Sequence, residues 1–262
     1  MKKKLLIVAT VLAVILILAV VVVGMSLGKI IKTGVETVGP KITKTEMKLD
    51  SANLSLLGGS GTLKGFVLGN PEGFKTPSAI KAGTVSVGVR PGSLFADKVH
   101  VMHVRVEGPE ITFEGTLGKA NNLSKIMENV EAATGGAEPG EKPAGKPSAE
   151  SDAPAKKLQV DEFTITGARV HLSMTMFGGK AVTMPLPDIR LKDLGTGPEG
   201  ITAGELTKKV LKSVTVETFK AVEKAVVDFG KNAAGAVTKG ATDVLDKGVQ
   251  GVKSIGDIFK KK

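Results

Sequence analysis

The chain is 262 residues long, carries a net charge of +10 and contains no Cys, Trp or Tyr. Without cysteine it has neither a disulfide framework nor a zinc–cysteine site, so its stability must come from packing. The positive charge raises nucleic acid as a partner, but single-strand binders stack bases on aromatic side chains, which make up only 3% of this chain. We therefore expect no nucleic acid partner. Two interpretations of the charge remain: attraction to anionic lipid headgroups, or a solvated surface.

Residues 5–23 form an uninterrupted apolar run in which Thr10 is the only polar side chain. As a helix the run would be about 28 Å long, close to the roughly 30 Å thickness of a bilayer's hydrocarbon core. It is longer than the apolar region of a signal peptide and no A-x-A cleavage site follows it, which favours an uncleaved signal anchor over a removed signal. Three lysines at positions 2–4 predict a cytoplasmic N-terminus, with the rest of the chain across the membrane.

The pattern after the anchor changes from helical to strand-like and back. Helical spacing up to Gly39-Pro40 gives way to alternation of apolar and polar residues, which predicts short antiparallel strands with one apolar face. A short helix begins near Asn121 or Asn122, and Thr202 with Glu205 forms a capping box before a longer one. The expected division is: 1–28 basic N-terminus and transmembrane anchor, 29–40 juxtamembrane helix, 41–134 first β region with its short helix, 135–157 flexible insert rich in Pro, Gly, Lys and Glu, 158–195 second β region, and 202–262 amphipathic basic helices.

The two β regions match each other at an offset of 59 residues. The aligned positions are apolar or glycine in both: Val101, Val104, Val106, Gly108, Ile111 and Phe113 correspond to Val160, Phe163, Ile165, Gly167, Val170 and Leu172. Such matches suggest a repeated strand–turn–strand unit. Alternating apolar patterns also produce matches of this kind by chance.

One turn carries a resemblance to a known family. Residues 54–74 are similar to the opening of AsmA-family envelope proteins, and the family's characteristic LGNPEGF segment is matched by Leu68, Gly69, Asn70, Pro71, Glu72, Gly73 and Phe74. Ser93-Leu94-Phe95, the segment 108–113 and Asn122-Leu123 continue the pattern in order. The resemblance covers about residues 5–130 well and 158–194 more loosely. The chain departs from large members in its short length, its charged insert and its basic C-terminal helices.

The resemblance implies a place in the AsmA and TamB group, whose architecture is related to bridge-like lipid-transfer proteins. Such proteins have a strongly curved antiparallel sheet whose apolar concave face forms a groove, anchored at one end in the inner membrane. The expected fold is therefore mainly β with α (α+β): an N-terminal transmembrane helix, a curved antiparallel groove and C-terminal amphipathic helices. The strands predicted from alternation are compatible with it.

No catalytic constellation accompanies these elements. His100 and His103 lie at positions that point to opposite faces of a strand, which argues against a shared metal site. We expect a non-enzymatic protein without metal or cofactor, and we interpret the Asn70-Pro71-Glu72-Gly73 segment as a structural corner.

The apolar strand residues are the candidate binding surface. They line either an open lipid groove or a core closed by the helix that begins at Thr202, and the sequence leaves both open. The candidates are Val85, Val87, Val89, Val104, Val106, Ile111, Phe113, Phe163, Ile165, Val170, Leu172 and Met174.

These expectations combine into one functional hypothesis with an alternative. The hypothesis is a single-pass inner-membrane protein with its bulk in the periplasm, which holds or transfers phospholipid acyl chains for outer-membrane homeostasis. The alternative is a structural or assembly module of the cell envelope that binds protein partners through open sheet edges.

Overall fold

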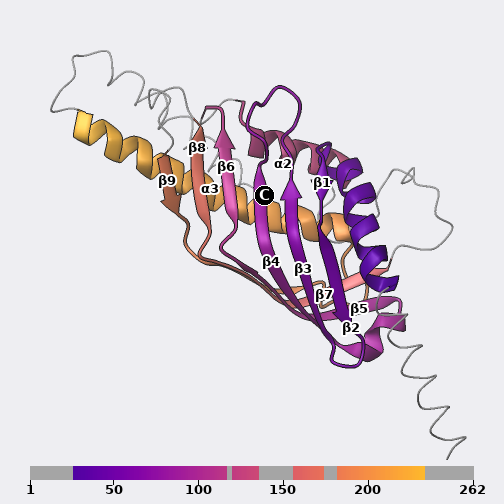
Figure 1. Cartoon of the computed structure of the whole chain (residues 1–262). Helices are drawn as coiled ribbons and strands as arrows, with labels where there is room; N and C mark the ends of the chain where they lie inside the picture. Colours follow the sequence, from indigo (N-terminus) through magenta and orange to yellow (C-terminus); the bar gives the residue numbers. More distant parts are fainter. Residues whose placement is uncertain (1–25, 117–119, 136–155, 174–181, 234–262) are drawn as a thin grey trace, which may run out of the picture.

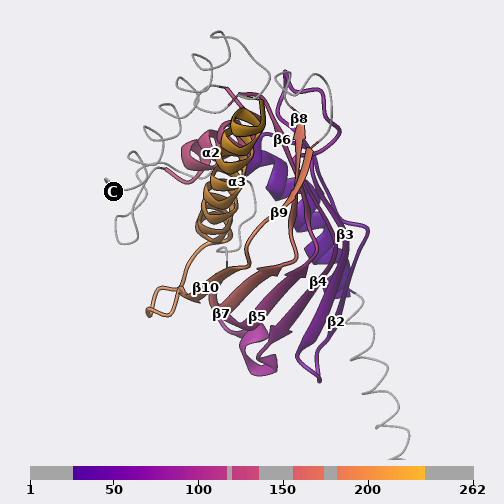
Figure 2. The same ribbon diagram turned by 90° about the vertical axis from the view of Figure 1, so that its left-hand side faces the viewer.

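The computed structural model describes residues 26–116, 120–135, 156–173 and 182–233. One ten-stranded sheet curls around two helices, α2 and α3, which lie on its inner side (Figures 1 and 2). Within the described residues no helix is long and apolar enough to cross a membrane. The predicted span at residues 5–23 lies outside them.

The elements follow each other in the order β1 (Met47–Lys48), β2 (Ser51–Ser55), β3 (Ser60–Leu68), β4 (Ile80–Val89), the 3₁₀ helix η1 (Pro91–Phe95), β5 (Lys98–Glu107), β6 (Glu110–Glu114), α2 (Asn122–Ala133), β7 (Lys157–Thr166), β8 (Arg169–Ser173), β9 (Val182–Pro185), β10 (Ile189–Leu194) and α3 (Ala203–Ala233). An N-terminal helix, described over residues 26–43, precedes them.

The ten strands form one continuous sheet. Its order is β10-β7-β5-β4-β6-β8-β9, and β3 pairs with the other side of β4 and carries β1 and β2 on its far side. β4 pairs with β5 along one half and with β6 at its start, so β5 and β6 are two halves of one bent strand. In the same way β10 and β9 pair with β7 and β8.

The prediction of a wholly antiparallel sheet is wrong, because β5 pairs with β7, and β6 with β8, in parallel. The chain leaves β6 at one end of the sheet, passes through α2, and begins β7 beside the start of β5. A crossover of this length allows a parallel pair, whereas a tight turn does not. The alternation of apolar and polar residues indicates which side of a strand is buried, but it does not indicate whether the strand is parallel or antiparallel to its neighbour.

The predicted repeat of 59 residues is visible in these parallel pairs. Lys98 faces Lys157, Val106 faces Ile165 and, beyond the bend, Ile111 faces Val170, each 59 residues apart. The two units therefore lie side by side in register.

Both units bend at the same line. Gly108 and Gly167 have φ of 57° and 63°, in the left-handed region that favours glycine. The Gly108 N–H donates to the Thr166 carbonyl at 2.8 Å, and the Arg169 N–H donates to the Pro109 carbonyl at 2.9 Å. Because these hydrogen bonds join the two bends, the two units stay paired across the bend and the sheet remains continuous there.

The helix starts predicted from local residues are confirmed. The Asn121 side chain accepts the Ser124 N–H at 2.8 Å at the start of α2. Before α3 the Glu205 carboxylate accepts the Thr202 N–H at 2.6 Å, and Thr202 Oγ1 accepts the Glu205 N–H at 3.1 Å. The juxtamembrane helix, however, runs to residue 43 instead of ending at Pro40. The proline carbonyl accepts the Lys44 N–H at 2.9 Å, and the chain leaves the helix at Lys44, whose φ is 54°.

The main core lies between the β6, β8 and β9 end of the sheet and the helices α2 and α3. At its centre Phe113 is fully buried and meets Phe219 of α3 edge-on, with ring centroids 5.8 Å apart and an interplanar angle of 85°. A second, smaller core closes the opposite end of the sheet and comprises Val89, Val101, Val160, Leu194 and Ile201.

Candidate functional site

The predicted groove residues divide into a closed and a partly open set. Ile111, Phe113, Val170 and Leu172 are at most 1% exposed and belong to the main core beneath the helices, so they do not line an open groove. Four others are also buried: Val85, Val89, Val106 and Ile165. Val87, Val104 and Phe163 are only half-buried. Met174 lies outside the described residues.

The half-buried residues form one row across the sheet. Val87 faces Val104 on β5, which faces Phe163 on β7, which in turn faces Leu191 on β10. On the other side Val87 faces Gly61, which faces Leu54 on β2. We call this the apolar row: Leu54, Gly61, Val87, Val104, Phe163 and Leu191. Apart from the buried glycine, all its members are half-buried.

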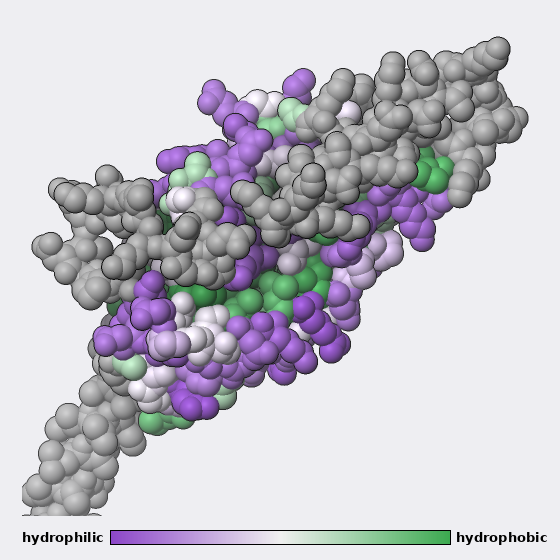
Figure 3. Space-filling view, turned by 180° about the vertical axis from the view of Figure 1, so that it is seen from behind, coloured by the Kyte–Doolittle hydropathy of each residue, from purple (hydrophilic) through white to green (hydrophobic). Residues whose placement is uncertain are grey.

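The apolar row lies between the two closed cores. Four members of the row pack against both core clusters: Val87, Val104, Phe163 and Leu191. The rest of their side-chain surface is exposed to solvent. Figure 3 shows a hydrophobic strip flanked by hydrophilic side chains on the face that carries α3. Six strands at a spacing of about 4.8 Å make the row about 24 Å long.

Sequence reasoning missed three members of the row: Gly61 and the two leucines. Leu191 alternates with Arg190 and Lys192, and Leu54 alternates with Asn53 and Ser55, so each gave a strand signal. What the sequence lacked was the pairing that places both in line with Val104.

The described residues contain one close histidine–carboxylate pair. His100 Nε2 lies 2.7 Å from Asp161, whose pKa is lowered by a hydrogen bond from Gln159 and, against some desolvation, by His100. Ser93 Oγ donates to the Arg90 carbonyl and accepts the backbone N–H of His100, so its hydroxyl is not paired with the imidazole. Among the described residues no group of His, Cys, Asp or Glu could hold a metal ion.

The family-motif turn is built as a corner. Asn122, fully buried at the start of α2, donates to Asn70 Oδ1 at 2.8 Å and to the Thr112 carbonyl at 2.7 Å, and accepts the Glu114 N–H at 3.0 Å. Asn70 in turn donates to Thr76 Oγ1 at 2.6 Å. The two segments that carry the resemblance, around Asn70 and Asn122, are therefore joined directly.

Glu114 closes this network. Its carboxylate accepts the N–H groups of Lys75 and Thr76, both at 2.7 Å, and the Thr76 hydroxyl at 2.6 Å. Burial raises the pKa of Glu114, but these hydrogen bonds outweigh that effect and hold the pKa below its ordinary value. Of the motif residues themselves, Leu68, Gly69 and Pro71 are buried, while Glu72 and Gly73 are exposed and Phe74 is half-buried.

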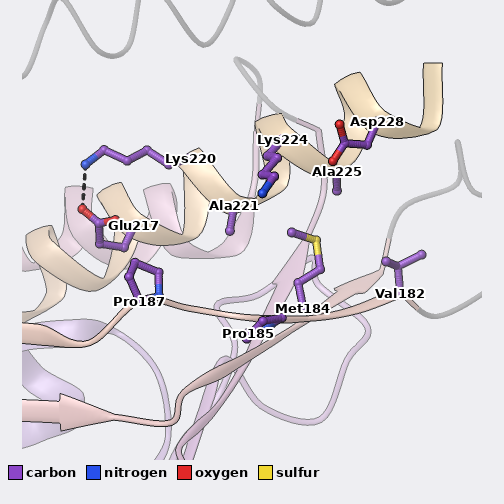
Figure 4. Close-up of a pocket in the computed structure, with 10 residues that line it drawn as sticks. All are labelled: Val182, Met184, Pro185, Pro187, Glu217, Lys220, Ala221, Lys224, Ala225 and Asp228. Carbon is purple, nitrogen blue, oxygen red and sulfur yellow. Dashed lines mark hydrogen bonds and ion pairs between the residues drawn. The ribbon is translucent and has the colours of Figure 1, made fainter. Parts of the chain in front are cut away.

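A pocket of about 600 Å³ lies between β9 and the second half of α3 (Figure 4). Met184 points from the strand toward the helix, and Lys220 on the rim pairs with Glu217 at 2.7 Å. Because Val182, Met184, Ala221 and Ala225 also pack against the main core, the pocket continues that core to the surface at the β9 edge. Its lining residues are Val182, Met184, Pro185, Pro187, Glu217, Lys220, Ala221, Lys224, Ala225 and Asp228.

Comparison with protein families gives a match to the AsmA family model over residues 1–186, more than half of the chain. The chain belongs to the AsmA family. Comparison with curated proteins and with solved structures finds no match. Membership of the AsmA family suggests an envelope-associated, lipid-related function, and the matched residues include the corner, the apolar row up to Phe163 and the bend that divides open from closed sheet.

Proposed function

We propose that this AsmA-family protein is a non-enzymatic, single-pass inner-membrane protein that shelters or transfers phospholipid acyl chains along the apolar row, in support of outer-membrane homeostasis. In this proposal residues 5–23 are the anchor, the N-terminus is cytoplasmic and the sheet is periplasmic. The observation that carries it is the row itself: half-buried apolar side chains in register across six strands, between two closed cores.

The dimensions of the row support an acyl chain as the occupant. A bilayer core of about 30 Å consists of two leaflets, so one chain reaches about 15 Å. The row, at about 24 Å, is longer than that. Each CH₂ that leaves water for an apolar surface contributes about 0.8 kcal/mol. A trough that is open on one side provides this stabilisation along the acyl chain, while the headgroup stays in water.

A part of each sheet edge is already blocked, which argues against the alternative, a module that pairs with partner strands. At the first edge the N-terminal helix already satisfies Leu49: its N–H donates to Glu36 at 3.1 Å and its carbonyl accepts the Lys32 ammonium. At the other edge Pro185 and Pro187 lack the N–H groups that strand addition requires. Edges built in this way resist pairing.

The test is lipid capture by the full-length protein. The wild-type chain, Val104→Glu and the matched control Met102→Glu are purified in mild detergent, and co-purifying phospholipid is quantified by mass spectrometry. Met102 lies on the same strand but is 39% exposed and outside the row. We expect phospholipid with wild type and the control and its loss with Val104→Glu, while circular dichroism stays unchanged.

Phe163→Ser provides a second row variant that adds no charge. Wild-type protein without bound phospholipid, or row variants that retain it at the control level, would overturn the proposal.

A further inference from the structure

One end of the sheet gathers three segments that are distant in sequence. The β2–β3 turn contacts the end of β4, just before η1, where the Val89 N–H donates to the Gly59 carbonyl at 2.6 Å. The Lys156 ammonium donates to the Leu94 carbonyl of η1 at 2.6 Å, and Lys98 reaches the loop after β10. Figures 1 and 2 show η1 beside this turn at the lower end of the molecule. We call this end the basic tip: the turn residues Leu56 and Leu57, η1, Arg90, Lys98, Lys156 and Lys157.

The basic tip exposes a large apolar side chain. Leu57, in the β2–β3 turn, is 82% exposed, compared with 64% for Ile30, 48% for Val38 and 39% for Met102. At this exposure its side chain makes little contact with the other described residues. Such a side chain is what a membrane interface accepts, because it buries apolar atoms below the headgroups without moving the backbone.

Positive charge lies along the same end of the sheet. Arg90 and Lys156 are exposed and Lys98 and Lys157 are half-buried, whereas Asp97 and Glu199 are the acidic residues of the adjoining loops. The ammonium groups of Lys98 and Lys156 each use one donor on a backbone carbonyl, and an ammonium has three. Four basic groups face three acidic ones, Asp97, Glu199 and Asp161, so the basic tip keeps an excess of one positive charge that attracts anionic headgroups.

The route of the chain places the basic tip close to the predicted anchor. Gly28 of the N-terminal helix packs against the Ala52 carbonyl of β2, where a Cβ would collide with that oxygen. Val23, the last residue of the apolar run, is five residues before Gly28, which is a reach of at most about 17 Å. Leu57 is itself only five residues beyond Ala52. If residues 5–23 span a bilayer, its surface therefore lies within reach of the basic tip.

We propose that the basic tip docks on the headgroup layer of the anionic membrane that holds residues 5–23, with Leu57 inserted below the phosphates. The inference rests on the anchor of the proposed function. It adds a defined orientation: Leu54, the first member of the apolar row, is three residues from Leu57, so docking sets one end of the row at the membrane surface.

The absence of cysteine makes a direct test simple. Leu57→Cys in the full-length chain is labelled with an environment-sensitive fluorophore and reconstituted in nanodiscs of phosphatidylcholine, with or without phosphatidylglycerol, and quenching by nitroxide-labelled lipid is measured. Val38→Cys is the matched control, because it is also exposed and apolar but lies toward the far end of the N-terminal helix. A surface-bound apolar group lies about 5–10 Å into the boundary, so we expect about threefold more quenching at Leu57 than at Val38 in anionic discs.

The charge requirement has its own variant. Arg90→Gln combined with Lys156→Gln should reduce quenching at position 57 in anionic discs to the level in neutral discs. Equal quenching at positions 57 and 38 in protein that has entered the discs would overturn docking, and so would a shifted emission without lipid quenching, which indicates contact between copies. A failed anchor gives a different result, because the protein would then be missing from the disc fraction.

Discussion

The division of the sheet into a closed core and an open row predicts unequal costs for two phenylalanines. Phe113 is fully buried against Phe219, so Phe113→Ala should destabilise by about 3–5 kcal/mol. About 0.5–1.5 kcal/mol of this is the edge-on ring contact. For a domain of this size each kcal/mol lowers Tm by about 2–4 °C, so Tm should fall by roughly 6–20 °C.

Phe163 provides the comparison within the same sheet. Its side chain is half-buried in the apolar row, so only part of its apolar surface is removed from water on folding. Phe163→Ala should therefore cost about 1–2 kcal/mol, less than the cost at Phe113. The two substitutions remove the same atoms, so the difference between their losses of stability measures how completely each side chain is enclosed.

The assay is thermal unfolding of the full-length protein in mild detergent, followed by far-ultraviolet circular dichroism because the chain has no Trp or Tyr fluorescence. A double-mutant cycle with Phe219→Leu isolates the ring contact. Equal losses at Phe113 and Phe163 would refute the division of the sheet. A loss below about 1 kcal/mol at Phe113 would refute the packing of α3 on this core.

Three further predictions concern the corner and the N-terminal helix. The lowered pKa of Glu114 means that its contribution is complete above its ordinary pKa and is lost as the pH falls through the lowered value, so Glu114→Gln should destabilise at neutral pH and converge with wild type in acid. Asn122→Ala should lower the free energy of unfolding by about 1–3 kcal/mol for each buried partner left unsatisfied, as denaturant titration would show. Gly28→Ala should destabilise because its Cβ meets the Ala52 carbonyl, whereas Gly34→Ala, with open space around it, should stabilise the same helix by up to about 1 kcal/mol. Equal Tm changes at the two glycines would contradict that packing.

Local signals predicted local structure well. The cap at Asn121 and the capping box at Thr202 each depend on residues within one helical turn, and both were readable before any tertiary contact was known. Strand positions were predicted for a similar reason, since alternation depends only on which side of the strand faces the core. Strand direction was missed because it depends on the crossover through α2, which no short pattern encodes.

The boundary between the open and the closed part of the sheet could not be predicted from the sequence for a different reason. Val104 and Ile111 both lie on apolar faces of the same bent strand, and their patterns are indistinguishable. Their burial differs because α2 and α3 cover the part beyond the bend at Gly108 and leave the row before it partly uncovered. A helix sequence specifies that it has an apolar face, but not how far along a sheet that face extends.

The register of the repeat gives the row its continuity. The parallel pairs join residues that are one repeat apart. Val104 and Phe163, which are equivalent positions of the two units, are therefore neighbours. The same holds for Gly108 and Gly167 at the bend. An apolar residue fixed at one position of the unit therefore extends the row across every copy that pairs in this way, by about 4.8 Å per strand. A slip of one residue between β5 and β7 would turn the β7 member of the row to the outer face. The in-register pairing of β5 and β7 thus joins the two units within the strip, and antiparallel pairs extend it on either side.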